Sequence, residues 1–157
     1  MMCKYVVFVI CAVIYADSCA ANAQSEGFVG FSVSLDQIKS ITNGQTVKYT
    51  NVIANAGNHY NIATGVFTAP RTAYYLFHIH AVSNGHTGFW FQLMHNEIPR
   101  INCHGNPQNY WTMGGNSVLL EVKAGERVYV KGFQETSHVY GSGTEHYATF
   151  TGHQAGQ

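Results

Sequence analysis

The sequence predicts an all-β domain that is built as an antiparallel sandwich. About ten short runs rich in aromatic and β-branched residues follow one another at regular spacing, which is typical of sandwiches and barrels. Turn signals such as Asn43-Gly44 and Asn84-Gly85 separate these runs. Between Leu35 and the C-terminus no stretch keeps the 3.6-residue period of an amphipathic helix.

Residues 1–23 are expected to be a secretion signal peptide, which leaves residues 24–157 as one globular domain. Lys4 supplies the positive charge, the apolar run from Tyr5 to Tyr15 has the length of a signal core, and Ala21-Asn22-Ala23 offers a small-x-small cleavage site. The run is too short to span a bilayer comfortably. We therefore expect a secreted, extracellular protein without a membrane span.

Cleavage would remove three of the four cysteines and leave Cys103 alone. A domain with one cysteine has no intrachain disulfide and depends on its hydrophobic core. We expect Cys103 to be a buried thiol, and a disulfide between two chains is the alternative.

The chain is poor in charge and rich in aromatic residues. Only 10% of its residues are charged, with 8 basic and 8 acidic side chains, while 13% are aromatic; a typical domain is roughly one quarter charged. No basic stripe is present that could hold nucleic acid. Burial of large surfaces against partner subunits would explain this composition.

The first predicted strand is Phe28–Leu35, in which the side chains alternate between apolar and small polar. Val29, Phe31, Val33 and Leu35 are expected to face inward, and Gly30, Ser32 and Ser34 outward. A short strand, Val47–Tyr49, is expected after the turn at Asn43-Gly44.

The stretch from Val52 to His80 is expected to organise the domain. Turn residues bound two short extended pieces, around Tyr60 and at Val66-Phe67, and Pro70 ends the second. The strand Ala73–His80 follows. Its Tyr75, Phe77 and Ile79 lie on one face, and Tyr74, Leu76, His78 and His80 on the other. Since both faces carry bulky side chains, we expect this strand to be covered on both sides.

The second half of the chain is expected to supply the remaining strands. Residues 104–115 are rich in Gly and Asn and predict a loop, and Lys123-Ala124-Gly125-Glu126 predicts the turn of a hairpin. The strands expected here are Gly88–His95, Ile98–Asn102, Ser117–Val122, Arg127–Lys131 and Tyr147–Gly152.

Several motifs, in order and at matching spacing, resemble those of the C1q globular domain in the C1q/tumour necrosis factor superfamily. The resemblance covers nearly all of residues 24–157. Two departures are Ala73, where the family usually has glycine, and the polar end His153–Gln157, where a hydrophobic run is usual. The matching motifs are Val29–Val33, Gly57–Asn61, Thr64–Phe67, Ala69-Pro70, Tyr75–Ile79, Leu93–Glu97, Asn116–Leu120, Gly125–Val128 and Phe150–Gly152.

The resemblance implies a ten-stranded antiparallel jelly-roll sandwich of the C1q/TNF type, assembled as a homotrimer. The core signature of that fold corresponds to Phe31, Tyr60, Phe67, Tyr75, Phe77 and Phe150. The strand Ala73–His80 would lie in the sheet that faces the neighbouring subunits, so Tyr74, Leu76, His78 and His80 would belong to the subunit interface. The sequence contains no Gly-X-Y collagen segment.

His78 and His80 are two residues apart on one strand face, a spacing that can chelate a metal ion. A trimer with this face near its axis would gather three copies of the pair. A divalent metal, zinc or calcium, is therefore the one cofactor that the sequence suggests, and none is certain. The alternative is that both histidines pack as ordinary amphipathic side chains.

No Gly-x-Ser-x-Gly elbow or pair of carboxylates indicates catalysis, so we expect a binding protein and not an enzyme. The first hypothesis is a secreted, lectin-like module of innate immunity that binds carbohydrate or microbial surface ligands. A secreted matrix or signalling protein that binds a receptor, with metal held by its histidines, is the second. The expected ligand contacts, unless the loops that carry them are ordinary surface, are Asn109, Tyr110, Trp111, His138 and Tyr140.

Overall fold

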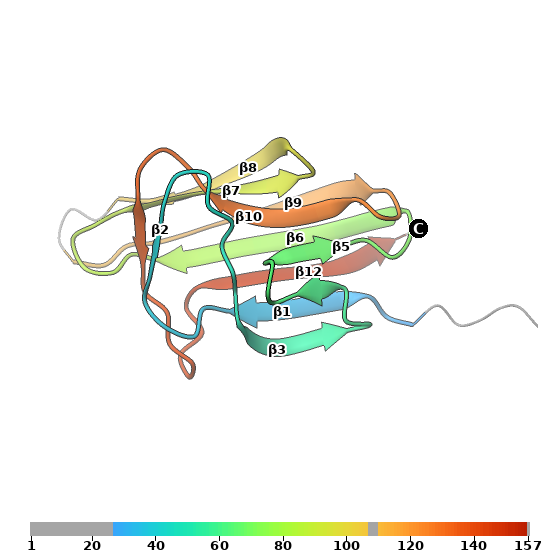
Figure 1. Ribbon diagram of the computed structural model, residues 1–157, viewed down its shortest axis with the longest axis horizontal. Helices are drawn as coiled ribbons and strands as arrows, with labels where there is room; N and C mark the ends of the chain where they lie inside the picture. The colour runs from blue at the N-terminus through green and yellow to red at the C-terminus, as the bar shows by residue number, and fades with distance from the viewer. Residues whose placement is uncertain (1–26, 107–109, 157) are drawn as a thin grey trace, which may run out of the picture.

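Two five-stranded antiparallel sheets pack face to face in the computed structural model, which describes residues 27–106 and 110–156 (Figure 1). The first sheet has the order β3 (Asn51–Ala56), β1 (Gly30–Ser34), β12 (Thr149–Gly156), β6 (Ala73–Val82), β9 (Met113–Val122). The second has the order β4 (Tyr60–Asn61), β5 (Val66–Thr68), β10 (Arg127–Gly132), β7 (Phe89–His95), β8 (Ile98–Gly105). Two short strands, β2 (Lys39–Ile41) and β11 (Ser137–Val139), pair separately.

This arrangement confirms the predicted all-β, ten-stranded jelly-roll sandwich. Neighbours within each sheet are mostly distant in sequence, as β12 between β1 and β6 shows. No helix occurs in the described part of the chain, and so none that could cross a membrane. The predicted signal peptide, residues 1–23, lies outside the described residues.

Alternation fixes the inward face of β1 as predicted. Val29, Phe31, Val33 and Leu35 are all buried. Ser34 differs from the prediction, because it is fully buried on the outward side beneath other polar residues.

An aromatic cluster fills the space between the sheets. The Phe31 ring stacks on Tyr60 and Phe67, with centroids 5.0 and 5.2 Å away, and meets the edge of Phe150 at 4.8 Å. Tyr75 and Phe77 extend the cluster along β6. All six residues of the expected core signature are therefore buried together.

The predicted loop over residues 104–115 was too long. Strand β8 continues to Gly105, and β9 begins at Met113 and pairs with all ten residues of β6. The glycines in this stretch allow close backbone approach: a Cβ on Gly114 would lie 2.4 Å from the carbonyl oxygen of His104. They therefore permit strand packing where turn chemistry had been inferred.

Two other details of the strand prediction were wrong. Strand β9 pairs with β6 while β10 pairs with β5 and β7, so residues 123–126 connect the two sheets and close no hairpin. Val47–Tyr49 is not a strand, although Val47 and Tyr49 are fully buried. The polar end of the chain remains paired, since β12 follows β6 to Gly156, and backbone hydrogen bonds require no apolar side chains.

One end of the sandwich lies far from both ends of the described chain. Strand β1 starts and β12 finishes at the right of Figure 1, whereas β6 finishes and β9 and β12 start at the left. The connections at the left end form the candidate functional site.

Candidate functional site

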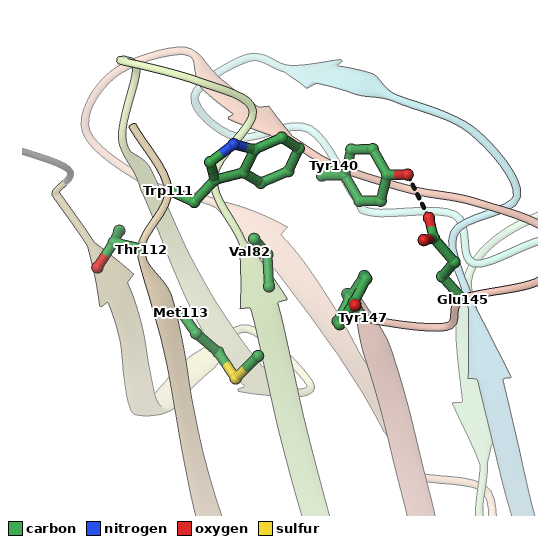
Figure 2. A pocket seen from close by; sticks show the side chains of 7 residues that line it. All are labelled: Val82, Trp111, Thr112, Met113, Tyr140, Glu145 and Tyr147. Atoms are coloured by element: carbon green, nitrogen blue, oxygen red, sulfur yellow. Dashed lines mark hydrogen bonds between the residues drawn. The ribbon is translucent and has the colours of Figure 1, made fainter. Parts of the chain in front are cut away.

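An open pocket of about 480 Å³ lies at the end of the sandwich where β6 finishes and β9 begins (Figure 2). Its volume is within the range of small-molecule sites, roughly 300–1,000 Å³. The residues that line it are Val82, Trp111, Thr112, Met113, Tyr140, Glu145 and Tyr147.

Three segments that are distant in sequence supply this lining. Val82 ends β6, Met113 opens β9 with Trp111 and Thr112 just before it, and the rest comes from the connection between β11 and β12. Backbone hydrogen bonds tie these segments together: the Tyr140 N–H donates to the Val82 carbonyl at 2.9 Å, and the Thr112 N–H donates to the buried Ser83 hydroxyl at 2.9 Å.

Three aromatic rings are inclined to one another around the pocket. The rings of Trp111 and Tyr140 have centroids 4.9 Å apart and planes at 73°, and those of Tyr140 and Tyr147 are 6.0 Å apart at 56°. The Tyr140 hydroxyl donates a hydrogen bond to the Glu145 carboxylate (Figure 2). This bond is the main cause that raises the pKa of Tyr140, so the phenol stays protonated.

A polar cluster beneath the pocket holds the segment that carries Glu145 and Tyr147. The Asn51 side-chain amide lies 3.0 Å from the Ser34 hydroxyl, 3.1 Å from His146 Nδ1 and 3.4 Å from the Gly143 carbonyl oxygen. The Ser34 hydroxyl is also 3.0 Å from His146 Nδ1. Because the Gly143 carbonyl oxygen can only accept, the Asn51 amide must donate to it. Asn51 of β3 thus holds the connection between β11 and β12 at Gly143 and His146.

The structure brings together two of the five expected ligand contacts. Trp111 and Tyr140 meet in the pocket. Tyr110 lies outside it, 64% exposed, with its ring against His86 at 5.1 Å. His138 sits on β11, where its Nδ1 is 3.0 Å from the Ser40 hydroxyl. Asn109 lies outside the described residues.

Sequence reasoning missed the other contributors to the pocket. The sequence pattern assigns Tyr147 to the predicted strand Tyr147–Gly152, and Glu145 belongs to no motif. The one sequence feature that could have placed them near the ligand contacts is their separation of only five and seven residues from Tyr140. The parts played by Val82 and Met113 depend on the pairing of β6 with β9, which brings these two residues opposite each other.

The outer face of the first sheet is a second candidate surface. Within the single chain only one face of β6 is covered. On the other face Tyr74 is 45% exposed, and Leu119 of β9, which pairs with Leu76 of β6, is 55% exposed. The outer positions around these residues carry histidine, serine and threonine. In β6 and β9 the only Asp, Glu, Lys or Arg is Glu121, which lies opposite Tyr74.

The two histidines proposed as metal ligands lie on this outer face together with His153. The Nδ1 atom of His78 is 2.7 Å from the Ser117 hydroxyl. Burial lowers the pKa of His78, and the nearby rings of His153 and His80 lower it further. Among the residues that the structure describes, no group of three or more His, Cys, Asp or Glu side chains could hold a metal ion within one chain.

The thiol of Cys103 is free and buried on β8, as predicted. Burial raises its pKa to about 12, so the reactive thiolate is absent at neutral pH. His104 follows it in sequence but points to the opposite side of the strand, against Trp90. This pair is therefore unsuited to nucleophilic catalysis.

Comparisons with a family model and with curated proteins point to the same family. Residues 30–154 match the C1q domain. The chain is 28% identical over 118 residues to mouse complement C1q tumor necrosis factor-related protein 6, and 27% identical to the rat protein of that name. Each match covers 74% of this chain and 45% of the relative, so the chain spans less than half the length of these curated relatives.

Solved structures agree with the fold. The globular domain of zebrafish complement 1qA superimposes with a TM-score of 0.68 at 21% identity, covering 81% of this chain and 97% of that one. The Eiger TNF of S. frugiperda superimposes with a TM-score of 0.69 at 13% identity, covering 83% and 94%. At these identities the likeness concerns the fold alone.

Proposed function

The chain belongs to the C1q domain family, and from this membership we propose that it is a secreted, non-enzymatic recognition module that binds carbohydrate or other ligands on microbial surfaces. The observation that carries the proposal is the aromatic pocket at the end of the sandwich remote from both ends of the described residues. Binding there leaves the opposite end free to connect to other components.

The pocket has the side chains that recognition of exposed surface groups uses. Trp111 and Tyr147 are 48% and 45% exposed, and large aromatic rings in this state offer contact area without much loss of conformational freedom. The hydroxyl of Tyr140 and the carboxylate of Glu145 add polar contacts beside the rings. The rigid sheets below hold these loops in place.

Trimeric assembly through the outer face of the first sheet is part of the proposal. The exposed Tyr74 and Leu119, the half-buried Leu76 and the scarcity of charge favour burial against a neighbour. Three pockets on one assembly would then bind a repetitive surface together, which increases avidity without any new contact.

A glycan array tests this function, run with and without added divalent metal. Binding of the assembled wild-type protein should be lost in the Trp111→Ala variant and kept in Tyr110→Ala, which removes an exposed ring outside the pocket. Loss in both variants, or no binding to any glycan or microbial surface, would contradict the proposal. Intact-mass analysis tests secretion separately, since the mature chain should begin near Ala21 or Gln24.

A matrix or signalling role is the second candidate, because His78, His80 and His153 gather on one exposed sheet face. In this case zinc held between subunits would strengthen assembly, and the ligand would be a cell-surface receptor. Saturable binding to one cell type, without any glycan signal on the array, would favour this candidate.

A further inference from the structure

We infer that the pocket at the loop end takes a quaternary ammonium group, the trimethylalkylammonium head of a choline-type ligand. The inference rests on the proposed function of this pocket as a recognition site and names the chemical class that it accepts.

The aromatic rings give the first reason. Trp111, Tyr140 and Tyr147 border one pocket, and their planes are inclined at 73° and 56° in the two adjacent pairs. Figure 2 shows Trp111 and Tyr140 next to each other, with Tyr147 below Tyr140. Mutually inclined rings around one space can contact a compact cation from several sides, and the negative faces of aromatic rings attract alkylammonium ions.

The charge of the lining gives the second reason. Glu145 is the one charged residue among the seven that line the pocket, and none of them is Lys, Arg or His. The Tyr140 hydroxyl donates to its carboxylate and so fixes its position at the edge of the rings. The carboxylate keeps further acceptor sites, because it has about four lone-pair positions. The pocket therefore favours a cationic group over an anionic one.

The apolar part of the lining favours this cation over a primary amine. Val82 is nearly buried at the base, and the thioether of Met113 lies beside it, 63% exposed. These groups contact methyl groups well but accept few hydrogen bonds. A trimethylammonium group has no N–H donors and can place its methyl groups against Val82 and Met113, whereas a primary ammonium ion must direct its three N–H donors away from them, towards Glu145 or water.

The decisive comparison uses choline and its neutral isostere 3,3-dimethylbutan-1-ol, titrated into the intact assembled protein by isothermal calorimetry. The two differ in charge but hardly in shape. We expect choline to bind at least about fivefold more tightly than the isostere, because the ring and carboxylate interactions act on the charge. If choline and the isostere bind equally well, or if neither binds, the inference is overturned. The second result includes the case in which a neighbouring subunit closes the pocket in the assembled protein.

Matched variants locate the binding. Glu145→Gln keeps a hydrogen-bond acceptor for Tyr140 but removes the charge, so it should weaken choline and leave the isostere unchanged. Trp111→Ala should weaken both, and Trp90→Phe, outside the pocket, should affect neither. Circular dichroism checks that each variant is folded. Unchanged choline binding in folded Glu145→Gln and Trp111→Ala would overturn the assignment.

Two further measurements separate the source of the group and the two proposals. Phosphatidylcholine vesicles and free phosphocholine distinguish a lipid surface from a soluble ligand that carries the same head group. Glycan binding that choline does not compete with would leave the recognition function standing and overturn this inference. Choline binding without any glycan binding would support the inference and contradict the carbohydrate part of the proposed function.

Discussion

The imidazole rings of His78 on β6 and His153 on β12 lie stacked, with centroids 6.3 Å apart and planes 17° apart. His80 shares the same outer face, and Ser117 and Thr151 flank His78 on the neighbouring strands. Loss of solvent around the ring is the first cause of the lowered pKa of His78, and the two other histidines add to it. Protonation of this group therefore opposes the folded state.

Acid should destabilise the protein through this cluster. Because the folded pKa of His78 is below the unfolded value of about 6.5, its contribution is fully present above pH 6.5. It decreases as the pH falls through 6.5 towards the lower folded value. Urea unfolding in EDTA between pH 7.5 and 5 should show a larger loss in wild type than in the His78→Gln, His80→Gln double variant.

Zinc provides the contrast in this experiment. It binds neutral imidazole, so a site that combines histidines of several subunits should oppose the acid effect and strengthen assembly at neutral pH. Sedimentation of both proteins with and without zinc measures this. Identical behaviour of wild type and double variant would assign both histidines an ordinary packing role.

Leu76→Asp should prevent trimer assembly. Leu76 lies on the outer face of β6, which carries few charges, and pairs with the exposed Leu119. An unpaired carboxylate in a desolvated interface costs on the order of several kcal/mol. Light scattering should give three times the protomer mass for wild type and one protomer mass for the variant. Ile98→Asp, at an exposed apolar site on β8 of the other sheet, is the control and should stay trimeric. A monomeric wild type at micromolar concentration would refute the interface.

Gly152→Ala should destabilise the core. A Cβ at this position of β12 would lie 2.6 Å from ring carbons of both Phe31 and Phe77, which are buried and cannot move aside. Overpacking of this kind costs about 1–3 kcal/mol, measured as a change in the free energy of unfolding in urea. Gly156→Ala on the same strand meets no atom within 4 Å and should cause little change. Equal effects in both variants would contradict the packing argument.

Asn51→Ala should loosen the connection that carries Glu145 and Tyr147. The variant removes the amide donors to the exposed Gly143 carbonyl, to the buried Ser34 hydroxyl and to the half-buried His146, while the contact between Ser34 and His146 remains. The net loss of a hydrogen bond of this kind costs about 0.5–1.5 kcal/mol. Hydrogen exchange should become faster in residues 141–147, and ligand binding weaker, while Gln37→Ala at an exposed position serves as control. Unchanged exchange would show that other contacts hold the segment.

Local patterns were sufficient for the main strands and the core. The alternation in Val29–Leu35 and in Tyr75, Phe77 and Ile79 placed the buried faces correctly, because a period of two on a strand admits only one inward set of side chains. Cys103 is buried as expected, although the count of cysteines alone left a disulfide between two chains open. The position of Trp111 and Tyr140 in exposed connections was also predictable from composition.

The sequence by itself thus determined most of the long strands, the inward faces of β1 and β6, and the two rings at the loop end, but not the strands β2, β3 and β11. Tertiary structure alone decided that β9 pairs with β6 and not with β10, that β2 meets β11, and that Val82, Met113, Glu145 and Tyr147 line one pocket. The reason is that strand partners are chosen by contacts between segments distant in sequence, and local periodicity carries no information on which edges will meet.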